Sequence, residues 1–209
     1  MKSLVITAMA ACLCSFASAG VWAEVGDAGP LPPGQITVGA GSLDLITGHL
    51  GGPVPDEEDM YCIHIPDPHH FRATTVGLTS IDTQLFLFNS AGMGVTFNDD
   101  SASTFQSTLT SAFLTSGGMY FLAISAYDHD AMSPGGEIWL DGPFGAERAP
   151  DGPGAGGPIV GWAGSSFSDG EYGIRLEGAE FCEPVPEPGT MAALGLGALA
   201  LIRRRRNKA

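Results

Sequence analysis

Two stretches decide the predicted fold: residues 82–100, "DTQLFLFNSAGMGVTFNDD", and residues 117–128, "GGMYFLAISAYD". Within them, residues 84–89 and 119–127 are apolar at nearly every position. Successive side chains of a β-strand point to opposite faces of the sheet, so a short run that is apolar on both faces indicates a strand buried on both. We therefore predict that these two segments are central strands.

Weaker patterns on either side predict the outer strands. Residues 61–65, "YCIHI", and 171–177, "EYGIRLE", place apolar side chains on one face and predict half-exposed strands. The inward-facing residues are expected to be Tyr61, Ile63, Ile65, Tyr172, Ile174 and Leu176. Further short strands are expected at residues 43–47, 71–75, 94–97, 105–109 and 137–140. Residues 141–158 are too rich in glycine and proline for a paired strand.

These patterns predict an all-β fold, an antiparallel β-sandwich of jelly-roll-like form over residues 35–183. Residues 24–34 form a Pro/Gly-rich leader before it. The chain has 23 acidic and nine basic residues, but six of the basic residues lie in the two terminal segments. Between those segments, three arginines face 22 acidic residues, a net charge of −19. Such a body repels nucleic acid and attracts cations.

The N-terminus, residues 1–23, is predicted to be a signal peptide with a short signal helix. Lys2 is followed by the apolar run "LVITAMAACLCSF", and small residues precede possible cleavage after Ala19 or after Ala23. A lipoprotein signal that uses Cys12 is the alternative. Removal of this segment leaves one cysteine pair, Cys62 and Cys182. In an exported protein we expect these two residues to form a disulfide, with two separate buried thiols as the alternative.

The tail, residues 184–209, joins three features. "VPEP" comprises Val185, Pro186, Glu187 and Pro188, residues 191–202 are uncharged, and a basic cluster follows at Arg203, Arg204, Arg205 and Arg206. Twelve to fourteen apolar residues make a short hydrophobic helix that is marginal for crossing a bilayer. Arginines after it are held on the cytoplasmic side. An ordinary C-terminal anchor is the alternative to a sorting signal.

The motif, the apolar run and the arginines together resemble the PEP-CTERM sorting signal of Gram-negative bacteria. The resemblance implies transient anchoring in the inner membrane and processing by an exosortase-type enzyme. It also implies delivery to the cell surface or extracellular matrix, in association with exopolysaccharide.

A second resemblance covers the body. The segments "DMYCIHIPDPHHFRATT" at residues 59–75, "DTQLFLFNSAGMGVTFNDD" and "GGMYFLAISAYD" are similar to bacterial pre-peptidase C-terminal domains. That resemblance implies a jelly-roll-like accessory module, related to domains that bind calcium. Such modules often stand beside a secreted hydrolase, but no such companion domain is expected within these 209 residues.

The acidic residues after two predicted strands are the candidate metal ligands: Asn98, Asp99, Asp100, Asp128 and Asp130. Ca²⁺ binds six to eight oxygen ligands, and loops at one end of a sandwich can gather them. The alternative is that these residues form turns. Asp59 or Glu58, in the acidic run at residues 56–59, is a second candidate ligand.

No catalytic arrangement is expected. His64, His69, His70 and His129 lack the spacing of a zinc site. Residues 161–170 lack the G-x-S-x-G elbow of serine hydrolases, and pairs of carboxylates arise by chance in so acidic a chain. Trp139 and Trp162 could stack sugar rings, although core packing is favoured for Trp139. Two functions therefore remain: a non-catalytic surface or matrix protein, or a carbohydrate-binding module, with or without calcium.

Overall fold

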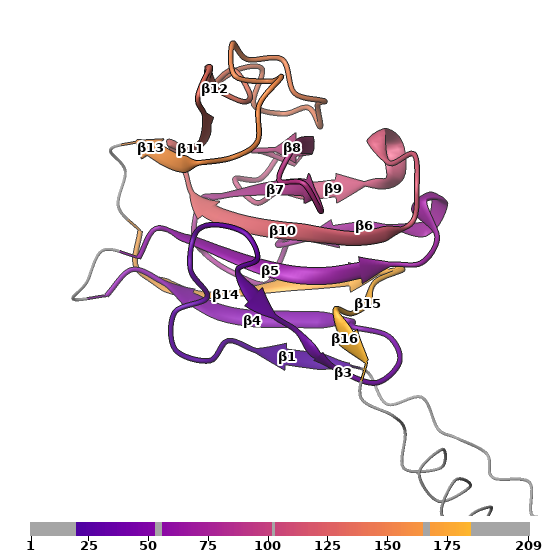
Figure 1. Cartoon of the computed structure of the whole chain (residues 1–209). Coiled ribbons are helices and arrows are strands. Elements are labelled where there is room, and N and C mark those ends of the chain that lie inside the picture. The colour runs from indigo at the N-terminus through magenta and orange to yellow at the C-terminus, as the bar shows by residue number, and fades with distance from the viewer. Residues whose placement is uncertain (1–19, 53–55, 102, 165–167, 185–209) are drawn as a thin grey trace, which may run out of the picture.

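The computed structural model describes residues 20–52, 56–101, 103–164 and 168–184. The expected signal helix and C-terminal helix fall on residues outside these ranges. The described residues form an all-β body of stacked sheets (Figure 1). Among them, no helix is long and apolar enough to cross a membrane.

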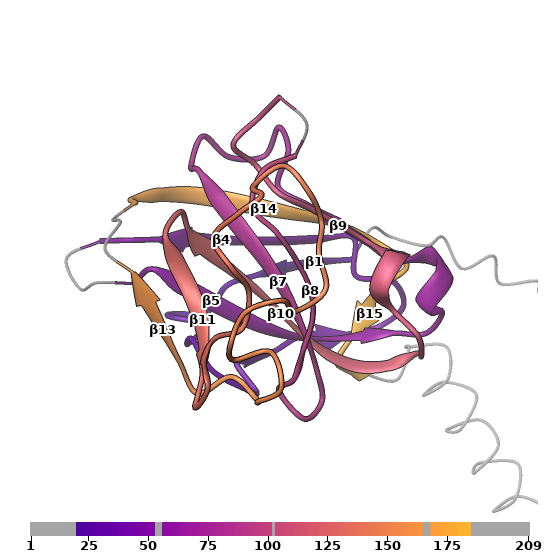
Figure 2. The ribbon, with the colours of Figure 1, turned by 90° about the horizontal axis from the view of Figure 1, so that it is seen from above.

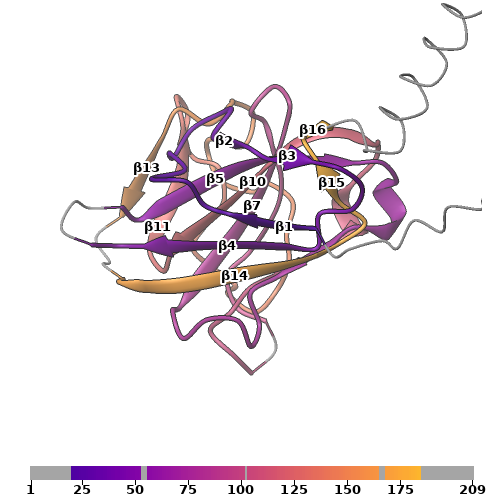
Figure 3. The same ribbon diagram turned by 90° about the horizontal axis from the view of Figure 1, so that it is seen from below.

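The first sheet has five strands in the order β1-β4-β14-β6-β9. Their bounds are β1 Val21–Ala23, β4 Leu45–Leu50, β14 Gly170–Glu177, β6 Arg72–Thr74 and β9 Thr108–Thr110. Strand β14 is half-exposed, as predicted, because Tyr172, Ile174 and Leu176 are buried while Glu171 and Arg175 face solvent. Seen from below, β14, β4 and β1 lie in front of β5, β10 and β7, which belong to the second sheet (Figure 3).

The second sheet has six strands in the order β15-β5-β10-β7-β8, with β2 also paired to β5. Their bounds are β15 Glu180–Phe181, β5 Glu58–Ile65, β10 Gly118–Ala126, β7 Thr83–Asn89, β8 Gly94–Asn98 and β2 Gln35–Ile36. Strands β7 and β10 pair directly, with Leu87 opposite Leu122. Both are buried on both faces, which confirms the prediction of two central strands.

A smaller covering sheet lies over the outer face of the second sheet (Figures 1 and 2). It has the order β12-β11-β13, with β12 Gly136–Glu137, β11 His129–Ser133 and β13 Gly161–Gly164. The loop of residues 141–158 has no strand, as predicted, and pairs with the edge of β8 through Phe97 and Arg148. A last parallel pair joins β3, Val38–Gly39, to β16, Glu183–Pro184. Two short 3₁₀ turns, η1 Pro68–His70 and η2 Ser111–Phe113, complete the described elements.

Two hydrophobic clusters follow from this layering. The first lies between the two large sheets and contains the inward-facing Tyr61, Ile63 and Ile65. The second lies between the second sheet and its covering layer and contains Met60, Cys62 and Trp139. The prediction that β5 is half-exposed was therefore wrong, because a third layer covers its other face.

Two further expectations need correction. The sheets are mixed rather than wholly antiparallel, because β1 pairs with β4, β2 with β5 and β16 with β3 in parallel. A jelly-roll order of strands stays a prediction. The leader carries no strand between residues 24 and 34, yet it packs on the body: Ala28 is buried, and Glu24 accepts hydrogen bonds from the N–H groups of Ala28 and His49. Strand β1 also lies within the segment expected to be the signal peptide.

Candidate functional site

The open end of the β7–β8 hairpin collects three aspartates. Leu85 pairs with Asn98 in this hairpin, so Asp99 and Asp100 emerge opposite the residues that begin β7. Asp82 immediately precedes β7 and meets them there. Carboxylate oxygens of Asp82, Asp99 and Asp100 all lie within 4.8 Å of one another.

Burial makes this arrangement unusual. Asp99 is 1% exposed, and among the described residues its Oδ1 atom has no hydrogen-bond partner. Asp82 Oδ1 is likewise buried without a partner. Removal of a carboxylate from water costs free energy unless hydrogen bonds or a cation compensate. The Oδ1 atoms of Asp82 and Asp99 therefore lie buried without a hydrogen bond or a cation to offset this cost.

The pKa values reflect the same cost. Burial, followed by repulsion from Asp100 and Asp82, raises the pKa of Asp99 to about 7. Burial and the charge of Asp100 also raise the pKa of Asp82. Both causes favour the neutral acid over the carboxylate. A bound cation would have the opposite effect.

Asp128 and Asp130 come close to this cluster without joining it. Both line a small polar cavity together with Asp99, Gln84 and Tyr127. Asp130 Oδ1 accepts a hydrogen bond of 3.2 Å from Gln84 Nε2, and burial raises the pKa of Asp130 to about 6. The end of β10 thus meets the end of β8, as the sequence predicted.

Asn98 uses both polar atoms of its side chain in hydrogen bonds to the backbone. Its Nδ2 donates to the carbonyl oxygen of Asp100 at 2.9 Å, and its Oδ1 accepts from the N–H of Thr108 at 2.8 Å. This side chain therefore holds the loop to β9. Asp82 is not among the ligands predicted from the sequence, because only the pairing register of the β7–β8 hairpin brings it beside Asp99 and Asp100. The stretch "DTQLFLFNSAGMGVTFNDD" contains both strands of that hairpin and was the available signal.

A second group of carboxylates gathers at Glu24, Asp56 and Asp59. Asp59 is fully buried, and its oxygens accept hydrogen bonds from the hydroxyl of Tyr172 at 2.6 Å and from the N–H of Ala28 at 3.3 Å. Burial raises its pKa to about 8. Glu58 points elsewhere, and its Oε1 lies 3.1 Å from His129 Nδ1. Of the two candidates in this run, only Asp59 meets other carboxylates.

His64, His70 and His129 each contact a different carboxylate. His64 contacts Glu180, His70 contacts Asp67, and His129 contacts Glu58. Among the described residues, both groups able to hold a metal consist of carboxylates alone. Of residues 161–170, the first four form β13 and the last begins β14. Residues 165–167 lie outside the described ranges.

The two tryptophans pack against phenylalanines. Trp139 is 3% exposed and lies 5.6 Å, centroid to centroid, from each of Phe86, Phe88 and Phe97. Trp162 meets Phe86 edge-on at 5.0 Å and donates its Nε1 hydrogen to the carbonyl oxygen of Pro30. Core packing accounts for Trp139, whereas Trp162 is only partly buried.

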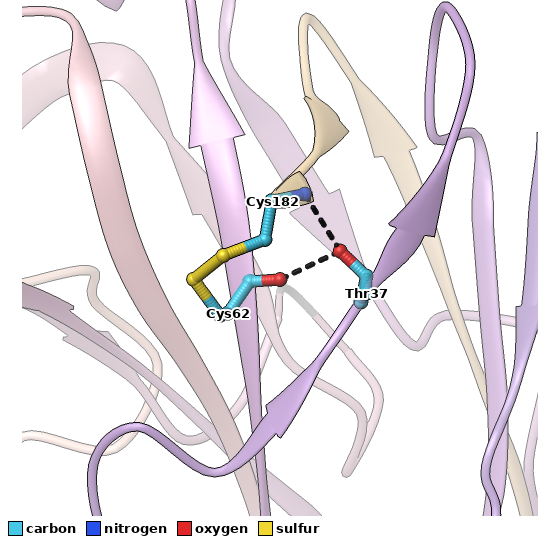
Figure 4. The surroundings of a disulfide bond; sticks show 3 residues. All are labelled: Thr37, Cys62 and Cys182. Carbon is cyan, nitrogen blue, oxygen red and sulfur yellow. Dashed lines mark hydrogen bonds between the residues drawn. A yellow bond between two sulfur atoms is a disulfide. The ribbon is translucent and has the colours of Figure 1, made fainter. Parts of the chain in front are cut away.

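A disulfide joins Cys62, in β5, to Cys182, which follows β15 (Figure 4). The Cα atoms are 5.5 Å apart and the bond spans 120 residues. The buried Thr37 hydroxyl donates to the Cys62 carbonyl oxygen at 2.7 Å and accepts from the Cys182 N–H at 2.9 Å (Figure 4). The last described segment is thereby attached to the middle of the body.

The fold and site define a class: a β-sandwich body with an acidic loop end and a long-range disulfide, a bond that persists in oxidising compartments. The particular assignment comes from the tail. A family model of the PEP-CTERM protein-sorting motif matches residues 184–206. The chain therefore carries an exosortase-type sorting signal and is exported to the cell envelope or surface. No curated protein matches the chain, and the resemblance of the body to pre-peptidase C-terminal domains stays a prediction.

Proposed function

We propose that this chain is a non-catalytic surface or matrix protein, released by an exosortase-type enzyme and held among exopolysaccharide. The observation that carries the proposal is the sorting motif at residues 184–206. It begins where the sandwich ends, because β16 closes at Pro184. The enzyme therefore meets its recognition motif next to a completed fold.

Each part of the tail has a physical task in this proposal. The uncharged residues 191–202 hold the exported chain in the inner membrane for a time. The four arginines that follow stay on the cytoplasmic side. Pro186, Glu187 and Pro188 then lie outside, where the enzyme reads them.

The absence of catalysis is part of the proposal, and the histidines support it. The rings of His49, His64, His70 and His129 each contact a different carboxylate. Nucleophilic catalysis needs a base within reach of a serine or cysteine. Both cysteines of the body are joined in the disulfide.

Two variants in the producing bacterium test the sorting proposal. Deletion of residues 191–209 removes the membrane-retaining segment, so we expect the body in the culture medium. Replacement of Pro186, Glu187 and Pro188 by alanine keeps that segment but removes the motif. We expect this variant to accumulate uncleaved in the membrane fraction.

For a sorting signal, each variant should differ from the natural chain in where the protein is found. If the alanine variant is cleaved and delivered like the natural chain, residues 186–188 are not the motif that the enzyme reads. If the deleted variant stays on the surface in unchanged amount, retention does not depend on the tail. Either result contradicts the proposal.

Carbohydrate binding is a second candidate function, and exposed aromatic rings at the acidic end favour it. Tyr127 and Phe144 are 41% and 43% exposed, and their ring centroids lie 6.3 Å apart. Both line the cavity that contains Asp99. A glycan array with the natural chain and a Tyr127→Ala variant tests this, with Phe113→Ala at η2 as the control. Binding that only Tyr127→Ala removes would favour the module over the plain matrix protein.

A further inference from the structure

We propose that Asp82, Asp99 and Asp100 bind a divalent cation, Ca²⁺, at the open end of the β7–β8 hairpin. This inference goes beyond the sorting function, since it concerns the folded body and not the tail. The three carboxylates lie within 4.8 Å of one another. That spacing suits oxygens that share one ion with a bond length of about 2.3–2.6 Å.

Unpaired oxygens distinguish this cluster from ordinary surface acidity. Asp99 is 99% buried, and its Oδ1 atom has no hydrogen-bond partner among the described residues. The neighbouring Asp82 Oδ1 is in the same condition. Buried polar atoms are nearly always satisfied by protein, water or an ion. A cation between these aspartates would satisfy both oxygens together.

The nearby cation does not neutralise the cluster. Arg148 is close enough to lower the pKa of Asp99, but this is the weakest of the influences on that carboxyl. Its guanidinium donates to Asp151 Oδ2 and to the carbonyl oxygens of Gly142 and Leu140. Those three bonds keep its Nη atoms in the loop that covers β8. Among the described residues, no hydrogen bond joins this guanidinium to the three aspartates.

The ligand chemistry selects the kind of ion. All three side chains offer carboxylate oxygens, which hard cations prefer, whereas zinc and copper sites favour nitrogen or sulfur. The neighbouring Asp128 and Asp130, with Asp99 along the same cavity, add further negative charge. Ca²⁺ tolerates irregular geometry better than Mg²⁺ does, and these ligands come from two strand ends.

The second acidic group lacks this evidence. In the group of Glu24, Asp56 and Asp59, the oxygens of Asp59 accept hydrogen bonds from Tyr172 and Ala28. Glu24 accepts hydrogen bonds from Ala28 and His49. Protein donors therefore already satisfy the carboxylates of Asp59 and Glu24. The group therefore supplies a matched control and not a second proposal.

Calcium titration of the full chain tests the proposal. The natural chain, Asp99→Asn and the control Asp56→Asn are each freed of metal with EDTA and titrated with CaCl₂ by calorimetry. Thermal unfolding is then compared in EDTA and in saturating Ca²⁺. For the natural chain and for Asp56→Asn, we expect binding and a rise in Tm of roughly 5–10 °C at about 100 times Kd.

Asp99→Asn should lose at least tenfold in calcium affinity and most of that rise. Its Tm in EDTA should not fall below that of the natural chain, because the amide removes the repulsion. If Asp99→Asn does not fold, Asp82→Asn and Asp100→Asn take its place, and each should weaken binding. Equal melting curves of the natural chain in EDTA and Ca²⁺ overturn the proposal. The proposal is also overturned if Asp56→Asn lowers the calcium affinity and the rise in Tm as much as Asp99→Asn does.

Discussion

Asp59 shows how the body holds a carboxyl group away from water. Its side chain is fully buried, and the hydroxyl of Tyr172 lies 2.6 Å from it. The Tyr172 hydroxyl in turn lies 2.5 Å from the hydroxyl of Tyr61, so the three groups form a chain across the main core. Burial raises the pKa of Asp59 to about 8 and keeps both tyrosine hydroxyls neutral, with pKa values above their usual range.

This raised pKa predicts an uncommon dependence of stability on pH. The unfolded value for aspartate is about 3.9, so between about pH 4 and pH 8 the folded state keeps a proton that the unfolded state releases. The free energy of unfolding should therefore fall as the pH rises through this range. In EDTA, thermal unfolding followed by circular dichroism should give a lower Tm at pH 8 than at pH 5.

The variant Asp59→Asn tests whether Asp59 causes this fall in Tm with rising pH. An amide cannot ionise, and its oxygen can still accept the hydrogen bond that the Tyr172 hydroxyl donates to Asp59. We expect a clearly smaller drop in Tm between pH 5 and pH 8, with the remainder due to Asp56, Asp99 and Asp130, whose pKa values are also raised. A drop of the same size in both proteins would show that Asp59 is ionised at pH 5.

At the scale of elements, Thr37 holds together three segments that are distant in sequence. It lies between β2 and β3, is fully buried, and bonds to the backbone of both disulfide cysteines. The variant Thr37→Val keeps the shape but leaves the Cys182 N–H without its acceptor. We expect a loss of about 1–3 kcal/mol in the free energy of unfolding, measured by urea titration with the disulfide intact. Unchanged stability would contradict this role.

The first described residues predict where signal peptidase cuts. The Gly20 N–H donates to Asp44 Oδ2 at 2.9 Å, and β1 then pairs with β4. Cleavage after Ala23 would remove this edge strand, whereas cleavage after Ala19 leaves it whole and places a new ammonium group beside Asp44. N-terminal sequencing of the exported protein should begin at Gly20. A sequence that begins at Glu24 would show that the fold does not need β1.

The same scale shows what the sequence could predict. Strands β7, β10 and β14 were predictable because each is long enough to show its burial pattern. The covering sheet was not, because β12 and β13 have two and four residues and show no period. That omission caused the error over β5. At the candidate site, the acidic loop was visible in the sequence, but the inclusion of Asp82 and the exclusion of Asn98 depended on pairing between strands.

At the scale of the whole molecule, the first and last described segments lie at one end of the sandwich. Phe181 packs close to Gly20, and Glu180 pairs with His64 near the start of β10. The aspartate cluster lies at the other end, where Thr83 pairs with the last residue of β10. Nine residues of extended strand separate the two ends by about 30 Å. The acidic end therefore lies opposite the end that contains Gly20 and Phe181.

The central claim is that the tail is a sorting signal that is removed, and the intact mass of the surface protein tests it most directly. Mass spectrometry of the protein recovered from the cell surface should give a mass without the apolar run and Arg203–Arg206. A digest of the same sample should yield peptides from the body and none from residues 191–209. A surface protein whose mass includes the four arginines would contradict the account.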